Sequence, residues 1–122
     1  MKHPDSLLLY VKDTAETARF FHQLFEIPVV EQSGNFALLA APNGWALGLW
    51  ASHDVKPAPR SGAGGFEMLI TLETDAAVDA ALVQAKALGA FVTLAPVRLD
   101  FGYTFVVESP DGHFIRVFHP KA

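Results

Sequence analysis

Histidines and carboxylates are the side chains in this sequence that could ligate a metal or transfer a proton. The chain of 122 residues has five histidines, thirteen acidic residues and no cysteine. The histidines are widely spaced and form no His-x-His or His-Glu-x-x-His motif, and no serine, histidine and aspartate are grouped as a triad. Asp5 and Asp13 are better explained by turn and helix-cap chemistry than by acid–base work. Local spacing therefore gives no sign of a metal centre or of an activated nucleophile.

The chain contains an internal repeat. Pro42-Asn43-Gly44 and Pro110-Asp111-Gly112 are both turn sequences between apolar runs, and residues 37–50 can be laid on residues 105–118 without a gap, at an offset of 110 − 42 = 68. A duplicated unit in so short a chain predicts two equivalent sheets around one shared space. The residues that differ between the two copies should then indicate what that space holds.

The first copy has the pattern β-α-β-β-β. Residues 6–11 are apolar and β-tolerant, and Asp13 with Glu16 forms a capping-box pattern that predicts a helix start. Pro28 ends that helix, and residues 29–32, 36–41 and 45–51 are predicted strands. The apolar stripe of the helix follows 3, 4, 7, 8 spacing and consists of Thr17, Phe20, Phe21, Leu24 and Phe25.

The second copy repeats that order. Residues 67–72 predict a strand, Thr74 or Asp75 caps a helix to about Leu88, and Gly89 is a natural residue just beyond its end. Residues 91–94, 103–108 and 113–119 supply the last strands. The first strands align at 67 − 6 = 61, so the second copy carries 68 − 61 = 7 extra residues, which we expect within 95–102.

These patterns predict one α+β domain of two βαβββ modules, about 1–55 and 66–122, joined by a linker at about 56–65. Each sheet has one face under its helix and another that is still apolar. We therefore expect the modules to cover each other within a chain or across a homodimer, with exchanged modules as one option.

Composition narrows the functional classes. Half of the residues are hydrophobic (51%) and the net charge is −4, which predicts a folded protein and argues against nucleic acid or an anionic membrane as partner. No apolar run is long enough to span a bilayer and no leader opens the chain, so we expect a cytoplasmic protein.

The element order, with Phe20-Phe21-x-x-Leu24-Phe25 early and Ser109-Pro110-Asp111-Gly112-His113 late, resembles the vicinal oxygen chelate superfamily. That superfamily includes glyoxalase I, extradiol dioxygenases and bleomycin-type resistance proteins. The resemblance covers nearly the whole chain and implies its glyoxalase/bleomycin-resistance fold, a curved mixed sheet with outer helices. Since the superfamily hosts both enzymes and binding proteins, the fold alone does not assign a function.

The resemblance also implies where a metal would be held. The metal enzymes place one ligand on the first and last strand of each copy, and those positions are Ser6, Gly48, Glu67 and Arg116 here. Only Glu67 is a metal ligand in character, because glycine has no donor and arginine is a permanent cation. We therefore expect no metal and no cofactor.

The replaced positions imply a charge pair. Glu67 and Arg116 stand where the metal enzymes bring two ligands to one ion, so Arg116 should present its planar fork to Glu67, to a ligand's oxygen, or to both. The alternative is that either is a surface residue of its strand. Changing Arg116 to methionine is expected to keep the fold and weaken ligand binding.

Aromatic residues complete the predicted site. Trp50 lies two residues after Gly48 on the same strand, so both face the same side of the sheet. The indole ring and the space left by the glycine predict a slot for a flat ligand. The alternative is that Trp50 packs in the core or at an interface. Tyr10 faces the same side of its strand as Ser6 and is predicted to line the cavity. Phe36 is the first residue of the third strand, and the sequence does not determine which face of the sheet it occupies. Phe101 and Tyr103 flank the insertion as a predicted mobile rim, unless the tyrosine simply fills a strand position.

A closer resemblance rests on Leu49-Trp50-Ala51, Phe66-Glu67, residues 101–105 and residues 110–117. These segments resemble the metal-free phenazine-antibiotic resistance proteins, which stack planar aromatic drugs on a tryptophan equivalent to Trp50, as dimers with cavities at the junction of the two copies. Tyr103 departs from that pattern.

The function expected from this resemblance is sequestration of a planar aromatic compound, such as a phenazine-type antibiotic, without turnover. Two enzymatic alternatives stay open: a metal-dependent lyase, isomerase or dioxygenase, and a metal-free enzyme. In the second, Glu67 is the base and Arg116 stabilises an oxyanion.

Overall fold

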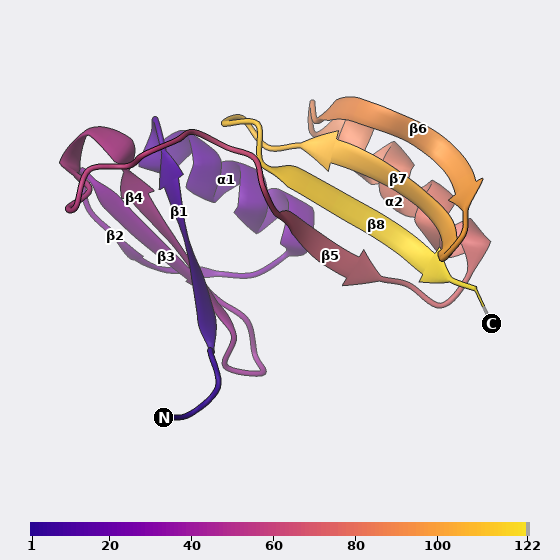
Figure 1. The fold of residues 1–122 in the computed structure, drawn as a ribbon, viewed down its shortest axis with the longest axis horizontal. Coiled ribbons are helices and arrows are strands. Elements are labelled where there is room, and N and C mark those ends of the chain that lie inside the picture. The colour runs from indigo at the N-terminus through magenta and orange to yellow at the C-terminus, as the bar shows by residue number, and fades with distance from the viewer. Residues whose placement is uncertain (122) are drawn as a thin grey trace. The chain divides into compact units, whose positions relative to one another are not determined.

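A computed structural model describes residues 1–121 of the chain. The chain forms two compact units, the first comprising Met1–Ala63 and the second beginning at Gly64 (Figure 1). The division falls inside the linker predicted at 56–65. Each unit has its own sheet and its own helix.

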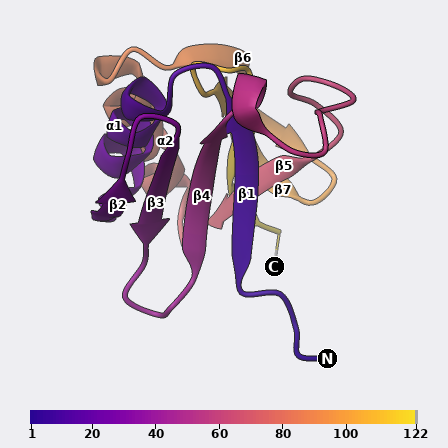
Figure 2. The same cartoon turned by 90° about the vertical axis from the view of Figure 1, so that its left-hand side faces the viewer.

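The first unit has the predicted β-α-β-β-β order. Its strands lie side by side in the order β1-β4-β3-β2, with β1 parallel to β4 and the other neighbours antiparallel (Figure 2). The elements are β1 (Ser6–Val11), α1 (Thr14–Phe25), β2 (Val29–Gln32), β3 (Phe36–Ala40), β4 (Ala46–Ala51) and a 3₁₀ turn, Ser52–Asp54.

Helix α1 begins where the sequence predicts it. The Asp13 side chain accepts a hydrogen bond from the Glu16 backbone N–H at 3.0 Å, which satisfies one of the free donors of the first turn. Phe21 is fully buried and packs against Phe25 with ring centroids 5.4 Å apart. One face of the first sheet is buried in this unit's core through Leu9, Val11, Leu39, Leu47 and Leu49. The other face of that sheet has no helix of the first unit over it.

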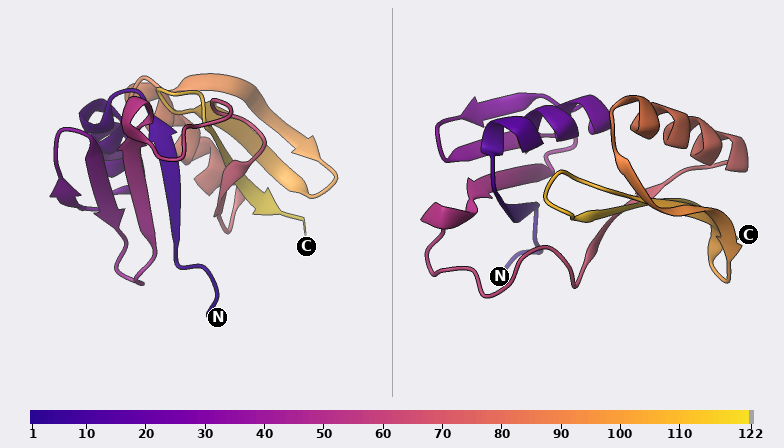
Figure 3. Two further views of the ribbon diagram at one scale, coloured as in Figure 1. Left: turned by 60° about the vertical axis from the view of Figure 1, so that its left-hand side comes forward. Right: turned by 90° about the horizontal axis from the view of Figure 1, so that it is seen from above.

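The second unit repeats this arrangement. Its sheet has the order β5-β8-β7-β6, and α2 lies along one face of it (Figure 3, right). The elements are β5 (Glu67–Thr71), α2 (Asp75–Ala87), β6 (Phe91–Leu99), β7 (Gly102–Glu108) and β8 (Phe114–Pro120). Thr74 caps α2 by accepting from the Ala77 N–H at 3.0 Å, and Gly89 follows the helix with φ of 81°. Val78 and Ala85 of the helix are buried, as are Phe105, Val107 and Ile115 of the sheet.

The two units therefore confirm the predicted pair of βαβββ modules, with one difference. The strand predicted at 91–94 continues to Leu99, and the extra residues lengthen the β6–β7 hairpin instead of forming a loop (Figure 1). The register shift between Leu94 and Val97 takes up one residue of this insertion, whereas the shift between Val92 and Leu94 has a counterpart between Val29 and Glu31 in the first unit. Pro96 is tolerated there because β6 is an edge strand, where a missing N–H costs no ladder bond.

Among the described residues, none of the helices combines the length and the apolar character that crossing a membrane would require.

Candidate functional site

Arg116 and Glu67 form a two-point polar contact in the second unit. The guanidinium donates from Nε to Glu67 Oε1 and from Nη2 to Glu67 Oε2, each at 2.9 Å. Strands β5 and β8 are parallel neighbours in which Arg116 is paired with Leu69, so the side chain reaches diagonally back to Glu67. The expected charge pair is present, and it is bidentate.

Other side chains hold the arginine from two sides. The Phe101 ring lies 5.6 Å from Arg116 Cζ and meets the ring of Phe118 edge-on at 5.7 Å. Nη1 of Arg116 approaches the Thr104 hydroxyl at 3.4 Å, and that hydroxyl donates to the Val117 carbonyl at 2.9 Å. The side chains of Arg116 and Glu67 remain 19% and 31% exposed, so the pair is accessible at the surface of its unit.

The contact favours the charged form of both Glu67 and Arg116. The hydrogen bonds from Arg116 hold the pKa of the Glu67 carboxyl below its usual value, against the opposing effect of burial. The same contact raises the pKa of Arg116. The carboxylate and the guanidinium therefore form a pair with no net charge. Glu67 already occupies the Nε–Nη2 edge of the guanidinium.

The residues at the four metal positions of the family do not fit a divalent metal. Gly48 has no donor atom, Arg116 is a cation, and both oxygens of Glu67 are engaged by that cation. The Ser6 hydroxyl donates to Asp5 Oδ1 at 2.8 Å. Across residues 1–121, no group of three or more His, Cys, Asp or Glu side chains is placed to hold an ion.

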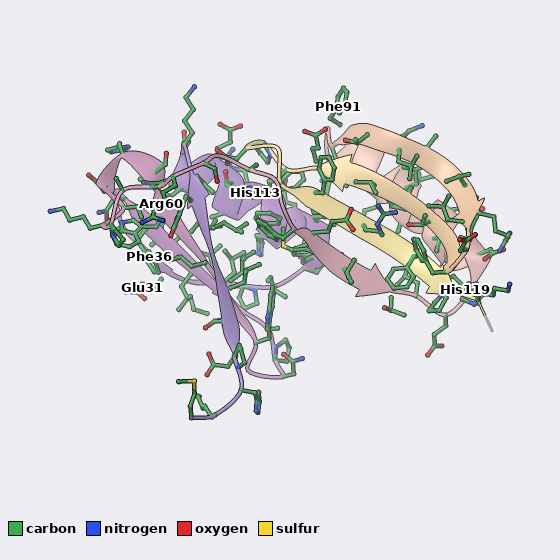
Figure 4. All side chains as sticks on the ribbon, in the orientation of Figure 1. Glu31, Phe36, Arg60, Phe91, His113 and His119 are labelled. Carbon is green, nitrogen blue, oxygen red and sulfur yellow. The ribbon has the colours of Figure 1, made fainter. Side chains whose placement is uncertain are left out.

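The first unit carries a row of aromatic residues. Trp50 on β4 is paired with Tyr10 on β1 and with Phe36 on β3, so the three side chains lie beside one another across three adjacent strands. They belong to the sheet face opposite the buried Leu9, Leu47 and Leu49 (Figure 4 labels Phe36). Pairing with Trp50 settles the face of Phe36, which strand parity alone left open.

The predicted vacancy over Gly48 is not empty. A Cβ at Gly48 would lie 2.9 Å from Leu8 Cδ1 and 3.6 Å from Phe36 Cζ. The glycine therefore makes room for two side chains of its own sheet, which corrects its assignment as clearance for a ligand. Leu8, the cross-strand partner of Gly48, was overlooked because an apolar strand residue gives no sign of its neighbour's size.

Tyr103 does not belong to the rim predicted for it. Its hydroxyl donates to Asp79 Oδ1 of α2 at 2.6 Å, so the ring lies on the helix-covered face, away from Arg116. Phe101, by contrast, lies over Arg116. The reason is strand alternation: Tyr103 is next to the buried Thr104, whose hydroxyl faces Arg116, and so points the other way. Sequence reasoning missed Thr104; its repeat position, 104 − 68 = 36, is that of Phe36 and could have indicated its face.

The candidate site residues thus divide into two sets. Ser6, Tyr10, Phe36, Gly48 and Trp50 belong to the first unit, where the last four are joined by strand pairing and side-chain proximity. Glu67, Arg116 and Phe101 belong to the second unit and contact one another through the guanidinium.

Comparison with known proteins agrees with this architecture. The model of the Glyoxalase/Bleomycin resistance protein/Dioxygenase superfamily matches residues 3–117. The solution structure of protein ATC0852 from Agrobacterium tumefaciens is similar at 36% identity, with a TM-score of 0.88 and complete coverage of both chains.

Two further solved structures share the fold. A glyoxalase-related enzyme from Fulvimarina pelagi has 20% identity and a TM-score of 0.84, over 98% of this chain and 88% of that one. A glyoxalase/bleomycin resistance protein/dioxygenase family enzyme from Burkholderia phytofirmans has 21% identity and a TM-score of 0.82, over 96% and 98%. No curated protein matches the sequence.

Proposed function

Because the chain belongs to the glyoxalase/bleomycin resistance protein/dioxygenase superfamily, we propose that it is a metal-free protein that binds and sequesters a planar aromatic compound, such as a phenazine-type antibiotic. The observation that supports this function is the cross-strand row of Tyr10, Trp50 and Phe36. The proposed role is resistance by binding rather than by chemical conversion.

The row suits stacking because neighbouring strands lie about 4.8 Å apart, so three rings on three strands offer a flat surface roughly 10 Å across. Each favourable ring–ring contact is worth about 0.5–1.5 kcal/mol beyond the area it buries. Tyr10 is 43% exposed and brings a hydroxyl to the edge of the row, where a polar atom of a ligand could bond.

In the second unit, Arg116 would provide a polar contact to the ligand. Glu67 occupies its Nε–Nη2 edge and the Thr104 hydroxyl accepts one N–H of Nη1, so the second N–H of Nη1 is left to donate to a ligand oxygen or ring nitrogen. Since the pair carries no net charge, the preferred ligand is neutral. A multiply charged anion would have to displace Glu67 and leave a carboxylate without its partner.

The metal-free enzyme is the second candidate, with Glu67 as base. The lowered pKa of Glu67 weighs against it, because a carboxylate held by two hydrogen bonds is a weak proton acceptor. A turnover assay of the wild type against Glu67→Gln distinguishes the two: product formation that Glu67→Gln abolishes would favour the enzyme.

Fluorescence titration tests the binding function directly. The chain has two tryptophans, so a Trp45→Phe variant leaves Trp50 as the single indole. Phenazine should quench this variant saturably at one ligand per site, and mass spectrometry should recover the compound unchanged. The matched variant Trp50→Phe, which keeps the 36% exposed Trp45, should show no saturable quenching. Equal quenching of both variants would contradict the proposal.

We also propose that the chain functions as a homodimer. The first unit leaves the sheet face of Tyr10 and Leu8, each 43% exposed, without a helix of its own unit. In the second unit Leu69 is 61% exposed and Phe114 is 37% exposed. Apolar surface of this kind is typical of interfaces and binding grooves. Light scattering coupled to size-exclusion chromatography should give twice the chain mass, and a monomer at micromolar concentration would refute this.

A further inference from the structure

The second unit has a small cleft at the β6–β7 turn that the proposed function does not use. Its volume is about 280 Å³, and it is lined by Arg98, Leu99, Asp100, Gly102 and Lys121. Two cations, one acid and one apolar side chain thus surround a space near the lower end of the usual range for ligand pockets, about 300–1,000 Å³. A ligand with few heavy atoms would suit it.

Arg98 is held in place from the helix side. Arg98, Tyr103 and His119 are paired in register across β6, β7 and β8. Nη2 of Arg98 donates to Asp75 Oδ2 at 2.6 Å, and its Cζ lies 5.1 Å from the centroid of the Tyr103 ring. These two contacts fix the guanidinium before any ligand arrives, and they leave its Nε and Nη1 protons without a partner in residues 1–121.

Further hydrogen bonds hold the neighbouring side chains of this cluster. Asp75 Oδ1 lies 2.8 Å from His119 Nδ1, and the Tyr103 hydroxyl donates to Asp79. His119 and Arg98, in that order of effect, hold the pKa of Asp75 below its usual value, so this carboxylate stays ionised. Each of the three strands is therefore anchored to α2 by one polar side chain, beside the cleft (Figure 4 labels His119).

The rest of the lining is available to a ligand. The Lys121 backbone N–H donates to the Phe101 carbonyl at 2.7 Å, whereas its ammonium makes no ion pair within the described chain. The Asp100 carboxylate also makes no ion pair with residues 1–121. The Leu99 side chain is 40% exposed. Gly102 contributes backbone without a side chain, since a Cβ there would lie 2.1 Å from the His119 carbonyl oxygen.

We propose that this cleft binds a small 2-hydroxycarboxylate with an apolar side chain. Arg98 and Lys121 would hold the carboxylate, Asp100 would accept from the 2-hydroxyl, and Leu99 would contact the aliphatic part. Asp75 already balances the charge of Arg98, and Asp100 balances that of Lys121. A monoanion with a hydrogen-bond donor for Asp100 should therefore bind better than a dianion without one.

An NMR titration of the ¹⁵N-labelled protein with 2-hydroxyisocaproate tests this. Saturable shifts at the amides of Leu99, Gly102 and Lys121, with a Kd below about 10 mM, are expected. The uncharged 2-hydroxyisocaproamide and inorganic phosphate should each bind at least about 5-fold more weakly. Equal binding of the amide, stronger binding of phosphate, or the absence of saturable shifts would overturn the proposal.

Matched variants locate the site. Lys121→Met should weaken binding about 5-fold or more, while Lys86→Met, which removes the same charge from the exposed surface of α2, should leave it unchanged. Asp100→Asn should narrow the preference for 2-hydroxyisocaproate over isocaproate, which lacks the hydroxyl. If Lys86→Met weakens binding as much as Lys121→Met, the attraction is a general charge effect and the cleft is not the site.

Discussion

The guanidinium of Arg116 donates two hydrogen bonds of 2.9 Å to the carboxylate of Glu67. In the metal enzymes that the sequence resembles, the corresponding positions supply ligands to one ion. Here the contact makes a neutral pair that is partly exposed, with Phe101 over the guanidinium and the Thr104 hydroxyl beside it. Under the proposed function, the N–H of Nη1 that does not face Thr104 is the one that would donate to a ligand.

A double-mutant cycle should show strong coupling within this pair. Arg116→Met leaves the Glu67 carboxylate unpaired and should lower the free energy of unfolding by about 1–3 kcal/mol, between the values typical of exposed and buried pairs. Glu67→Gln with Arg116→Met should cost less than the sum of the single changes. Urea unfolding measures all four proteins, and additive effects would show that the contact contributes nothing to stability.

His113 should make the second unit sensitive to mild acid. Its side chain is buried, and burial lowers the pKa of the imidazole below 6.5, although the charge of Asp111 opposes this. The unfolded chain therefore binds the proton more readily, so stability should fall as pH falls below about 6.5.

Unfolding midpoints between pH 8 and pH 5 measure this effect. His113→Gln should flatten the dependence, whereas His53→Gln, at a side chain 74% exposed, should leave it as in the wild type. A wild-type slope retained in His113→Gln would assign the sensitivity to another group.

Two glycines should respond differently to alanine. At Gly102, φ is 149° and a Cβ would lie 2.1 Å from the His119 carbonyl oxygen, so Gly102→Ala should cost more than about 3 kcal/mol or prevent folding. At Gly48 the obstacle is Leu8 Cδ1 at 2.9 Å, the end of a flexible side chain, so Gly48→Ala should cost under about 1.5 kcal/mol. Thermal unfolding compares them; equal losses would contradict this account.

The Asp13 cap should contribute measurably to the first unit. Its carboxylate accepts from the Glu16 N–H at 3.0 Å, so Asp13→Ala should lower the free energy of unfolding by about 1 kcal/mol. Asp13→Ser keeps an acceptor and should recover most of that loss. Circular dichroism during urea unfolding reports both variants, and indistinguishable midpoints for alanine and serine would show that the cap is dispensable.

Much of the fold follows from local signals. The repeated Pro-Asn-Gly and Pro-Asp-Gly turns, the caps at Asp13 and Thr74, and the alternation of the strands predict both modules because each depends on residues near in sequence. The charge pair of Glu67 and Arg116 was predictable from the resemblance, since the two residues stand where the metal enzymes bring two ligands to one ion.

What lay beyond local signals was the pairing between strands. The register of β3 on β4 places Phe36 beside Trp50, and that of β1 on β4 fills the space over Gly48 with Leu8. Similarly, the long β6–β7 hairpin and the bond from Tyr103 to Asp79 depend on β-bulges and on the position of α2. The sequence by itself determined the order of the elements and the alternation of residues within each strand, although it did not show that β6 extends to Leu99. Only the tertiary structure decided which side chains meet, because a contact between distant residues depends on register and packing that no local pattern encodes.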